Sequence, residues 1–177
     1  MSDDTEILDR MRLIVESKKR LVLFSKSWQE TPHKSTVKLE FVTSLEVDSI
    51  TLEGVRLRGR AIKSLPESDT MFQLEMRYGS EWHHLCRLDW RPKHSHTDQV
   101  GPISDRANFS GSGWHSFDNN SKYGLWTLRD GNLPRAVAIA PEPQNFIDVL
   151  KEVERRMLID NACDIAAPNW ETQGTLL

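Results

Sequence analysis

Hydrophobic and polar residues alternate along much of the chain, with the two-residue period that is typical of β-strands. The pattern covers residues 37–41, 50–52, 55–61, 72–78 and 81–91. Successive side chains of a strand point to opposite faces of a sheet, so each run predicts a strand with one apolar face. Gly79 and Ser80, between the last two runs, suit a tight two-residue turn. We therefore expect an antiparallel hairpin at this point.

Two other segments repeat their apolar residues at the three- and four-residue spacing of an amphipathic helix. The first runs from Ile7 to Ile14, and the second begins near Pro143. The second segment carries the apolar stripe Phe146, Val149, Leu150, Val153 and Met157. No helical pattern separates consecutive strands, which argues against a parallel sheet. We predict an α+β fold, an antiparallel β-sheet of about five to seven strands flanked by an N-terminal and a C-terminal helix.

The length of 177 residues suits a single domain, which we place at residues 1–162, followed by a loose C-terminal tail at 163–177. The net charge of −3 gives no overall attraction to nucleic acid or anionic membranes, so such binding would depend on a local patch. Two cysteines are too few for a disulfide framework. The acidic N-terminus lacks the apolar segment of a secretory signal, and no apolar run is long enough to span a bilayer. These features predict a cytoplasmic protein that does not contact a membrane.

The stretch from Leu85 to His115 carries most of the candidate chemistry. Alternation divides the side chains of the strand predicted at 81–91 into two sets. The more apolar set, which we assign to the core, is Trp82, Cys86, Leu88 and Trp90. The opposite set is Arg87, Asp89 and Arg91. Residues 92–113 form a long polar loop, and loops of this length in compact domains are usually functional or mobile.

Histidines of this stretch are candidates for general acid–base catalysis, because histidine titrates near neutral pH. They are His94, His96 and His115. Phosphodiester cleavage needs a base for the attacking hydroxyl, an acid for the leaving oxygen and cations for the developing charge. Arg87 and Arg91 would supply the cations and bind phosphate, and Asp89 would orient a histidine. The alternative is that Arg87 and Asp89 form an ion pair while the histidines are exposed loop residues.

The same residues also suit a metal ion. In extended backbone the side chains of His94, His96 and Asp98 point the same way, and two nitrogens with one oxygen are ligands that zinc accepts. Asp89 or His115 would complete such a set. Zinc is therefore the candidate cofactor if the site is not metal-free.

Arginines line one face of the strand predicted at 55–61. They are Arg56, Arg58 and Arg60. If this strand lies near the hairpin, these arginines share a face with Arg87 and Arg91 and form a basic surface suited to phosphate backbones. The alternative is ion pairing with Glu40, Glu53 or Glu75. Trp114, in a Gly- and Ser-rich segment, is a candidate for stacking on the base of a ligand.

Several different short motifs are spread through the second half of the chain. They are Arg87-Leu88-Asp89, His96-Thr97-Asp98, Gly101-Pro102 and Trp114-His115-Ser116-Phe117, with the helix after Pro143. In this order they resemble a family of small uncharacterised bacterial and phage proteins, in which Arg-Leu-Asp precedes His-Thr-Asn and a His-x-aromatic strand. The segment Lys93-His94-Ser95-His96 is also distantly similar to a motif of TumE-type toxins from toxin–antitoxin pairs. The resemblance implies a mobile-element, toxin or phage-defence context.

We therefore predict a small toxin- or defence-type protein that acts on RNA or DNA, by metal-independent phosphodiester cleavage with histidine, arginine and aspartate. One alternative is a non-catalytic module that binds a protein partner, such as an antitoxin or a subunit of a defence complex. The other alternative is the His/Asp metal site. The chain has neither a phosphate-binding loop nor a dinucleotide-binding glycine motif.

Overall fold

An antiparallel sheet of eight strands forms the centre of the computed structural model, which describes residues 3–22, 28–129 and 132–171. The strands are β1 (Arg20–Leu21), β2 (Gln29–His33), β3 (Thr36–Val47), β4 (Ile50–Ile62), β5 (Thr70–Tyr78), β6 (Glu81–Trp90), β7 (His96–Thr97), β8 (Asn108–Phe109), β9 (Gly113–His115) and β10 (Val137–Ala138). The order in the sheet is β1-β3-β4-β5-β6-β9-β10, and β2 also pairs with β3. β7 and β8 form a separate two-stranded sheet.

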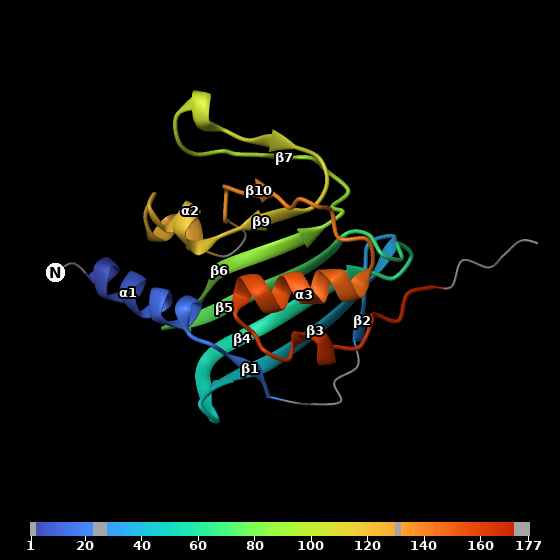
Figure 1. Cartoon of the computed structure of the whole chain (residues 1–177), viewed down its shortest axis with the longest axis horizontal. Helices are drawn as coiled ribbons and strands as arrows, with labels where there is room; N and C mark the ends of the chain where they lie inside the picture. The colour runs from blue at the N-terminus through green and yellow to red at the C-terminus, as the bar shows by residue number, and fades with distance from the viewer. Residues whose placement is uncertain (1–2, 23–27, 130–131, 172–177) are drawn as a thin grey trace, which may run out of the picture.

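Helix α3 (Phe146–Met157) lies across one face of the sheet (Figure 1). α1 (Asp3–Glu16) packs against β6 and against the short α2 (Phe117–Ser121). Single 3-10 turns are η1 (Ile103–Asp105), η2 (Leu125–Leu128) and η3 (Ala162–Asp164). None of the helices in the described ranges is long and apolar enough to cross a membrane.

The predicted α+β fold, with an antiparallel sheet between an N-terminal and a C-terminal helix, is confirmed. The sheet has eight strands rather than five to seven. β1, β9 and β10 have only two or three residues each, too few to show an alternating pattern in the sequence. Tertiary pairing, rather than local periodicity, makes these segments strands.

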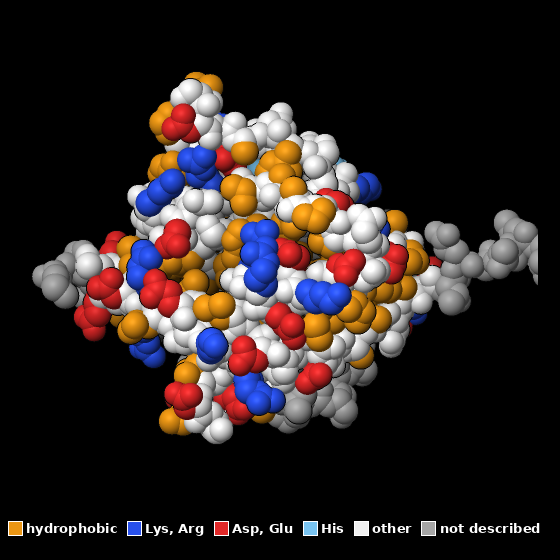
Figure 2. All heavy atoms as spheres, viewed as in Figure 1, with side chains coloured by type: hydrophobic (Ala, Val, Ile, Leu, Met, Phe, Trp, Pro, Cys, Tyr) orange, Lys and Arg blue, Asp and Glu red, His pale blue; other side chains and the backbone are white. Residues whose placement is uncertain are grey.

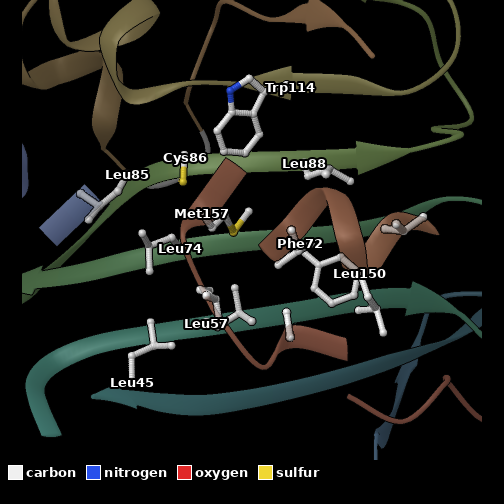
Figure 3. Packing of buried hydrophobic residues seen from close by; sticks show 14 of the residues in the cluster. Leu45, Leu57, Phe72, Leu74, Leu85, Cys86, Leu88, Trp114, Leu150 and Met157 are labelled. Carbon is white, nitrogen blue, oxygen red and sulfur yellow. The ribbon is translucent and has the colours of Figure 1, made fainter. Parts of the chain in front are cut away.

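The core lies between the sheet and α3 (Figure 3). The apolar stripe predicted for α3 is buried, and the ring of Phe146 lies 6.0 Å from Phe72 and 6.4 Å from Trp90. Asn145 caps the helix, because its side chain accepts a hydrogen bond from the backbone N–H of Asp148. Each fully buried large apolar side chain contributes about 1.5–3 kcal/mol, so this contact holds the helix to the sheet.

A β-bulge in β6 changes which side chains face the core. Cys86 lies opposite Leu74, but His84 lies opposite Glu75, so Leu85 is the extra residue. The assignment of Cys86, Leu88 and Trp90 to the core is confirmed. The assignment of Trp82 to the core is wrong, because a shift of one residue reverses the side-chain direction before the bulge.

We call the face of the sheet that lies opposite α3 the outer face. Its side chains on β4, β5 and β6 include Arg56, Arg58, Arg60, Met71, Gln73, Glu75, Arg77, Trp82, His84, Arg87 and Asp89. Arg91 does not belong to it, because its positive φ of 44° ends the strand alternation. On the opposite, helix-bearing side, positive and negative side chains are interspersed (Figure 2).

Two segments expected to be irregular are more ordered than predicted. The loop at 92–113 contains η1 and the β7–β8 hairpin, which projects beyond the sheet (Figure 1). In the expected tail, the backbone O of Ala166 accepts a hydrogen bond from Trp28 Nε1, and the rings of Trp170 and Phe146 lie 5.6 Å apart. The tail is therefore not loose over residues 163–171, and residues 172–177 lie outside the described residues.

Gly59 is required by the close approach of β3 to β4. It pairs with Phe41, whose ring occupies the space that a Cβ on Gly59 would need. We expect Gly59→Ala to lower the free energy of unfolding by about 1–3 kcal/mol, because the core has no room for the methyl group. Urea unfolding measures this change. Phe41→Leu should relieve the clash, so that the double variant loses less than the sum of the two single losses, whereas additive losses would contradict this account.

Candidate functional site

Three side chains meet on the outer face where β6 pairs with β9. Arg87 lies directly opposite His115 in the register of the two strands. Arg87 Nε lies 3.1 Å from Asp89 Oδ2, and Arg87 Nη2 lies 3.0 Å from His115 Nε2. Asp89 Oδ2 is also 2.9 Å from His115 Nε2. The three groups therefore form a closed triangle of polar contacts.

The other nitrogen of His115 is fixed by the backbone. Nδ1 lies 2.7 Å from the carbonyl oxygen of Leu133, so Nδ1 carries a proton and donates it to that oxygen. Nε2 can then accept from Arg87 when the ring is neutral, or donate to Asp89 when the ring is charged. The protonation state of His115 thus selects between two partners.

Burial lowers the pKa of His115 and so favours the neutral ring. The charge of Arg87 acts in the same direction, while Asp89 and the Leu133 carbonyl oppose it. For Asp89 burial would raise the pKa, but the contact with His115 and the charge of Arg87 bring it below its usual value. At neutral pH the triangle therefore contains an ionised Asp89, a charged Arg87 and a neutral imidazole.

A second pair, His96 and Asp98, lies on the β7–β8 hairpin. His96 Nε2 is 2.8 Å from Asp98 Oδ1. The carboxylate of Asp98 is buried and accepts three further hydrogen bonds, from the backbone N–H groups of Ala107 and Ala136 and from Arg135 Nε. Burial would raise the pKa of Asp98, but these hydrogen bonds and the charge of Arg135 hold it below its usual value. Asp98 is thus an ionised group that fixes the ring orientation of His96.

The two histidine pairs are in contact. The rings of His96 and His115 lie 4.9 Å apart at an interplanar angle of 89°. Phe109 of β8 supports His96 from another side, with ring centroids 5.3 Å apart. The ring of Phe109 in turn lies against Gly113, where a Cβ would come within 3.1 Å of it. A side chain at position 113 would therefore displace the ring that supports His96.

We call Arg87, Asp89, His96, Asp98 and His115 the two-histidine cluster. Its members differ in accessibility: the His115 side chain is only 1% exposed, whereas those of His96, Arg87 and Asp89 are 18%, 20% and 22% exposed. Nε2 of His96 is engaged by Asp98, and Nδ1 of His96 has no hydrogen-bond partner within the described ranges. His96 and Arg87 can therefore reach a bound molecule, while His115 acts from behind them.

The structure brings together Arg87, Asp89, His96 and His115 as expected, but not the other residues predicted for the site. His94 is exposed on the loop before β7 and has no contact with the cluster in the part of the chain that the structure describes. Arg91 instead contacts the backbone oxygens of Glu67 and Gln144.

Trp114 is not the exposed stacking residue that we expected. It alternates with His115 along β9 and points into the core, toward Met157 and α3 (Figure 3). Its side chain lies beneath the guanidinium of Arg156, 5.6 Å from the ring centroid. The surrounding Gly and Ser residues indicated a loop, but pairing with β10 makes the segment a strand.

The arginine row of β4 lies on the outer face with Arg87, and its charges are paired. Arg56 and Arg58 form ion pairs with the buried Glu75, and Arg60 pairs with Glu40. The predicted alternative of pairing with glutamates of neighbouring strands is therefore confirmed for Glu40 and Glu75. Phosphate binding by this row stays a prediction.

The arrangement of His94, His96 and Asp98 does not match the set of ligands expected for zinc. Among the described residues, no three side chains of histidine, cysteine, aspartate and glutamate gather so that they could hold a metal ion. His96 points its Nε2 at Asp98, so the two side chains face each other rather than a shared ligand.

Three groups of the site were not identified from the sequence. They are Arg135, which pairs with Asp98, the carbonyl oxygen of Leu133, and Asp98 in its orienting role. The two-residue spacing of His96 and Asp98 was the available signal, because side chains at this spacing share a face of a strand. Nothing in the local sequence marks Leu133 or Arg135, since tertiary folding alone brings them to the cluster.

The lowered pKa of His115 gives a pH-dependent stability. Below the ordinary histidine pKa of 6.5 the unfolded chain takes up a proton that the folded ring resists, so acid destabilises the fold through this group. Replacement of His115 by Gln removes the titration. We expect the stability advantage of the wild type over His115→Gln to shrink as the pH falls from about 7 to 5, by at most about 1.4 kcal/mol per pH unit. Urea unfolding at several pH values tests this, and an advantage that grows on acidification would mean that the fold favours the charged ring.

Comparison with protein-family models, with curated proteins and with solved structures finds no match to this chain. The resemblance based on short motifs therefore stays an expectation. Any function has to be inferred from the chemistry of the two-histidine cluster.

Proposed function

We propose that this protein cleaves RNA phosphodiester bonds at the two-histidine cluster, in a toxin- or defence-type role. The observation that carries the proposal is the oriented His96–Asp98 pair, whose imidazole contacts the ring of His115, the same ring that lies 3.0 Å from Arg87 Nη2. A buried aspartate that holds one imidazole nitrogen leaves the other nitrogen free to take a proton, which is the arrangement of a general base.

In the proposed reaction Nδ1 of His96 takes the proton of the ribose 2′-hydroxyl. The 2′-oxygen then attacks the adjacent phosphorus, and the bond from phosphorus to the 5′-oxygen breaks. The leaving 5′-oxygen takes a proton from water, and the hydroxide ion formed in this way takes back the proton held by His96. The products are a 2′,3′-cyclic phosphate and a free 5′-hydroxyl, so atoms and charges balance.

Arg87 is the group proposed to stabilise the charge that develops on the phosphorane oxygens. A guanidinium presents several N–H donors in a plane and stays charged at all relevant pH values. Asp89 and His115 hold it from two sides, at 3.1 and 3.0 Å. His115 is buried, and we therefore assign it a positioning role and not a contact with substrate.

RNA is the proposed substrate class because its 2′-hydroxyl supplies the nucleophile. Cleavage of DNA would require an activated water molecule instead, and the cluster offers one accessible imidazole for the whole proton transfer. One base, one cation and an internal nucleophile are sufficient for the first step of RNA cleavage.

We expect purified protein to cleave single-stranded RNA in the presence of EDTA, and His96→Gln to reduce the rate about a hundredfold or more, because a general base contributes at least that factor. His94→Gln is the matched control, since His94 lies two residues away on the loop before β7 and outside the cluster. Product analysis by gel and mass spectrometry should find the 2′,3′-cyclic phosphate.

Replacement of the 2′-hydroxyl by hydrogen at the scissile nucleotide should abolish cleavage. Equal loss of activity in the His94 and His96 variants would contradict the proposed base. Absence of cleavage for every RNA tested would overturn the proposal and favour the non-catalytic interaction module.

A further inference from the structure

A straight row of side chains crosses the outer face and leads away from the two-histidine cluster. Arg58 of β4 lies opposite Gln73 of β5, and Gln73 lies opposite Arg87 of β6. Arg87 in turn lies opposite His115 of β9. Residues that lie opposite each other in paired strands have their side chains on the same face. Neighbouring strands are about 4.8 Å apart, so the Cα atoms of Arg58 and Arg87 are separated by about 10 Å.

Two of the three arginines of β4 direct their guanidinium groups at partners within the protein. Arg60 donates from Nε and Nη2 to Glu40 Oε1, at 2.9 and 2.8 Å. Arg56 donates from Nε to Glu75 Oε2. The guanidinium of Arg56 also lies 3.4 Å from the centroid of the Trp82 ring. The contacts of these two arginines therefore have a structural role.

Arg58 has donors that these contacts leave unused. Its Nη1 forms an ion pair with Glu75 Oε1 at 3.5 Å, and the same oxygen accepts a hydrogen bond of 2.6 Å from Gln73 Nε2. Arg58 Nε is buried and has no hydrogen-bond partner among the described residues. A guanidinium carries five N–H donors, and proteins normally satisfy buried donors. The side chain of Arg58 is 25% exposed, so an acceptor can approach it from the solvent side.

The charges around Arg58 favour an anion as this acceptor. Arg56 and Arg58 are both paired with the carboxylate of Glu75, which has no exposed surface. Two guanidinium groups thus face one carboxylate, and the group of three carries an excess of positive charge. A phosphate suits such a site, because a guanidinium can hold two of its oxygens with parallel hydrogen bonds. Glu75 also restrains the guanidinium of Arg58, which lowers the entropy lost on binding.

We infer that Arg58 binds a backbone phosphate of the RNA on the 3′ side of the bond that the two-histidine cluster cleaves, an inference that rests on the proposed function. The RNA then crosses the strands of the sheet along the row, with the scissile phosphate at Arg87 and the second phosphate at Arg58. The separation of about 10 Å between the two arginines is one that one or two nucleotides of an extended strand can span.

The direction of the RNA follows from the order of the groups along the row. The β7–β8 hairpin, which carries His96, lies on the side of β6 away from β4 (Figure 1). The 2′-oxygen that gives its proton to His96 therefore attacks from that side. The attacking and leaving oxygens of a phosphoryl transfer lie roughly in line, so the leaving 5′-oxygen points toward Arg58. The nucleotides on the 3′ side of the scissile bond consequently lie over β5 and β4.

Replacement of single phosphates by neutral methylphosphonates tests this site. The substrates are 2′-O-methyl RNA strands with one unmodified ribonucleotide, which fixes the scissile bond, and one methylphosphonate on its 3′ side. We expect a neutral group at one of the first two linkages beyond the scissile bond to lower kcat/KM of the wild type about tenfold, because a charge-assisted hydrogen bond is lost. In Arg58→Gln the same neutral linkage should have almost no further effect.

The effect is a ratio of two substrates for one protein, so a smaller folded fraction of Arg58→Gln does not alter it. Arg77→Gln is the matched control, because Arg77 lies on the same face opposite Trp82 and outside the row. This variant should keep the ratio of the wild type, and Arg58→Lys, which keeps the charge, should keep part of it. Equal ratios for the wild type and Arg58→Gln at every linkage would overturn the phosphate site. An effect of Arg58 confined to linkages on the 5′ side of the ribonucleotide would overturn the inference as well.

A binding assay separates this inference from the proposed function. Fully 2′-O-methylated octamers cannot be cleaved, and fluorescence anisotropy at several salt concentrations measures their affinity. Arg58→Gln should weaken binding about tenfold and reduce the slope of log affinity against log salt by about one, as for one lost phosphate contact. This result together with no RNA cleavage by the wild type would overturn the proposed function and leave the phosphate site standing. Cleavage that requires His96, with no effect of Arg58→Gln in either assay, would overturn the phosphate site alone.

Discussion

The pairing of β6 with β9 is the contact on which the candidate site depends. Only three residue pairs form it, Arg87–His115, Leu88–Trp114 and Asp89–Gly113. This register sends Trp114 into the core and His115 to the outer face, beside Arg87 and Asp89. A slip of one residue would bury Gly113 and His115 in the core and expose Trp114, because neighbouring side chains of a strand point in opposite directions. Burial of Trp114 beneath α3 therefore fixes the position of the imidazole.

Periodicity predicted the parts of the fold that local sequence determines. The long strands β3 to β6 and the amphipathic helix α3 follow their patterns, and so does the division of Cys86, Leu88 and Trp90 from Arg87 and Asp89. The bulge at Leu85 was not predictable, because a histidine lies on each face of β6 just before it, His83 on one and His84 on the other. No local pattern encodes the tertiary contacts across the long loop. These contacts place His96 against His115, and they place Arg135 and Leu133 beside the cluster.

Buried carboxylates determine how the arginines of the outer face can act. Glu75 has no exposed surface and takes the charges of Arg56 and Arg58, so these arginines mainly hold the sheet and the indole of Trp82 in place. The buried Asp98 likewise forms an ion pair with Arg135 and holds it in place. Arg87 differs because its partner Asp89 is itself partly exposed and shares its contacts with His115. The outer face therefore combines fixed charges with one guanidinium whose environment depends on the protonation of a neighbour.

The order in which the ribosome makes the chain determines when the candidate site can form. His96 and His115 are translated well before Leu133 and Arg135, which orient the two rings through His115 Nδ1 and through Asp98. Trp114 also needs α3, translated later still, as its covering layer. A nascent chain therefore contains both imidazoles long before it contains the site. An unfinished copy would lack this arrangement of the two rings, and the cluster forms only after α3 has emerged.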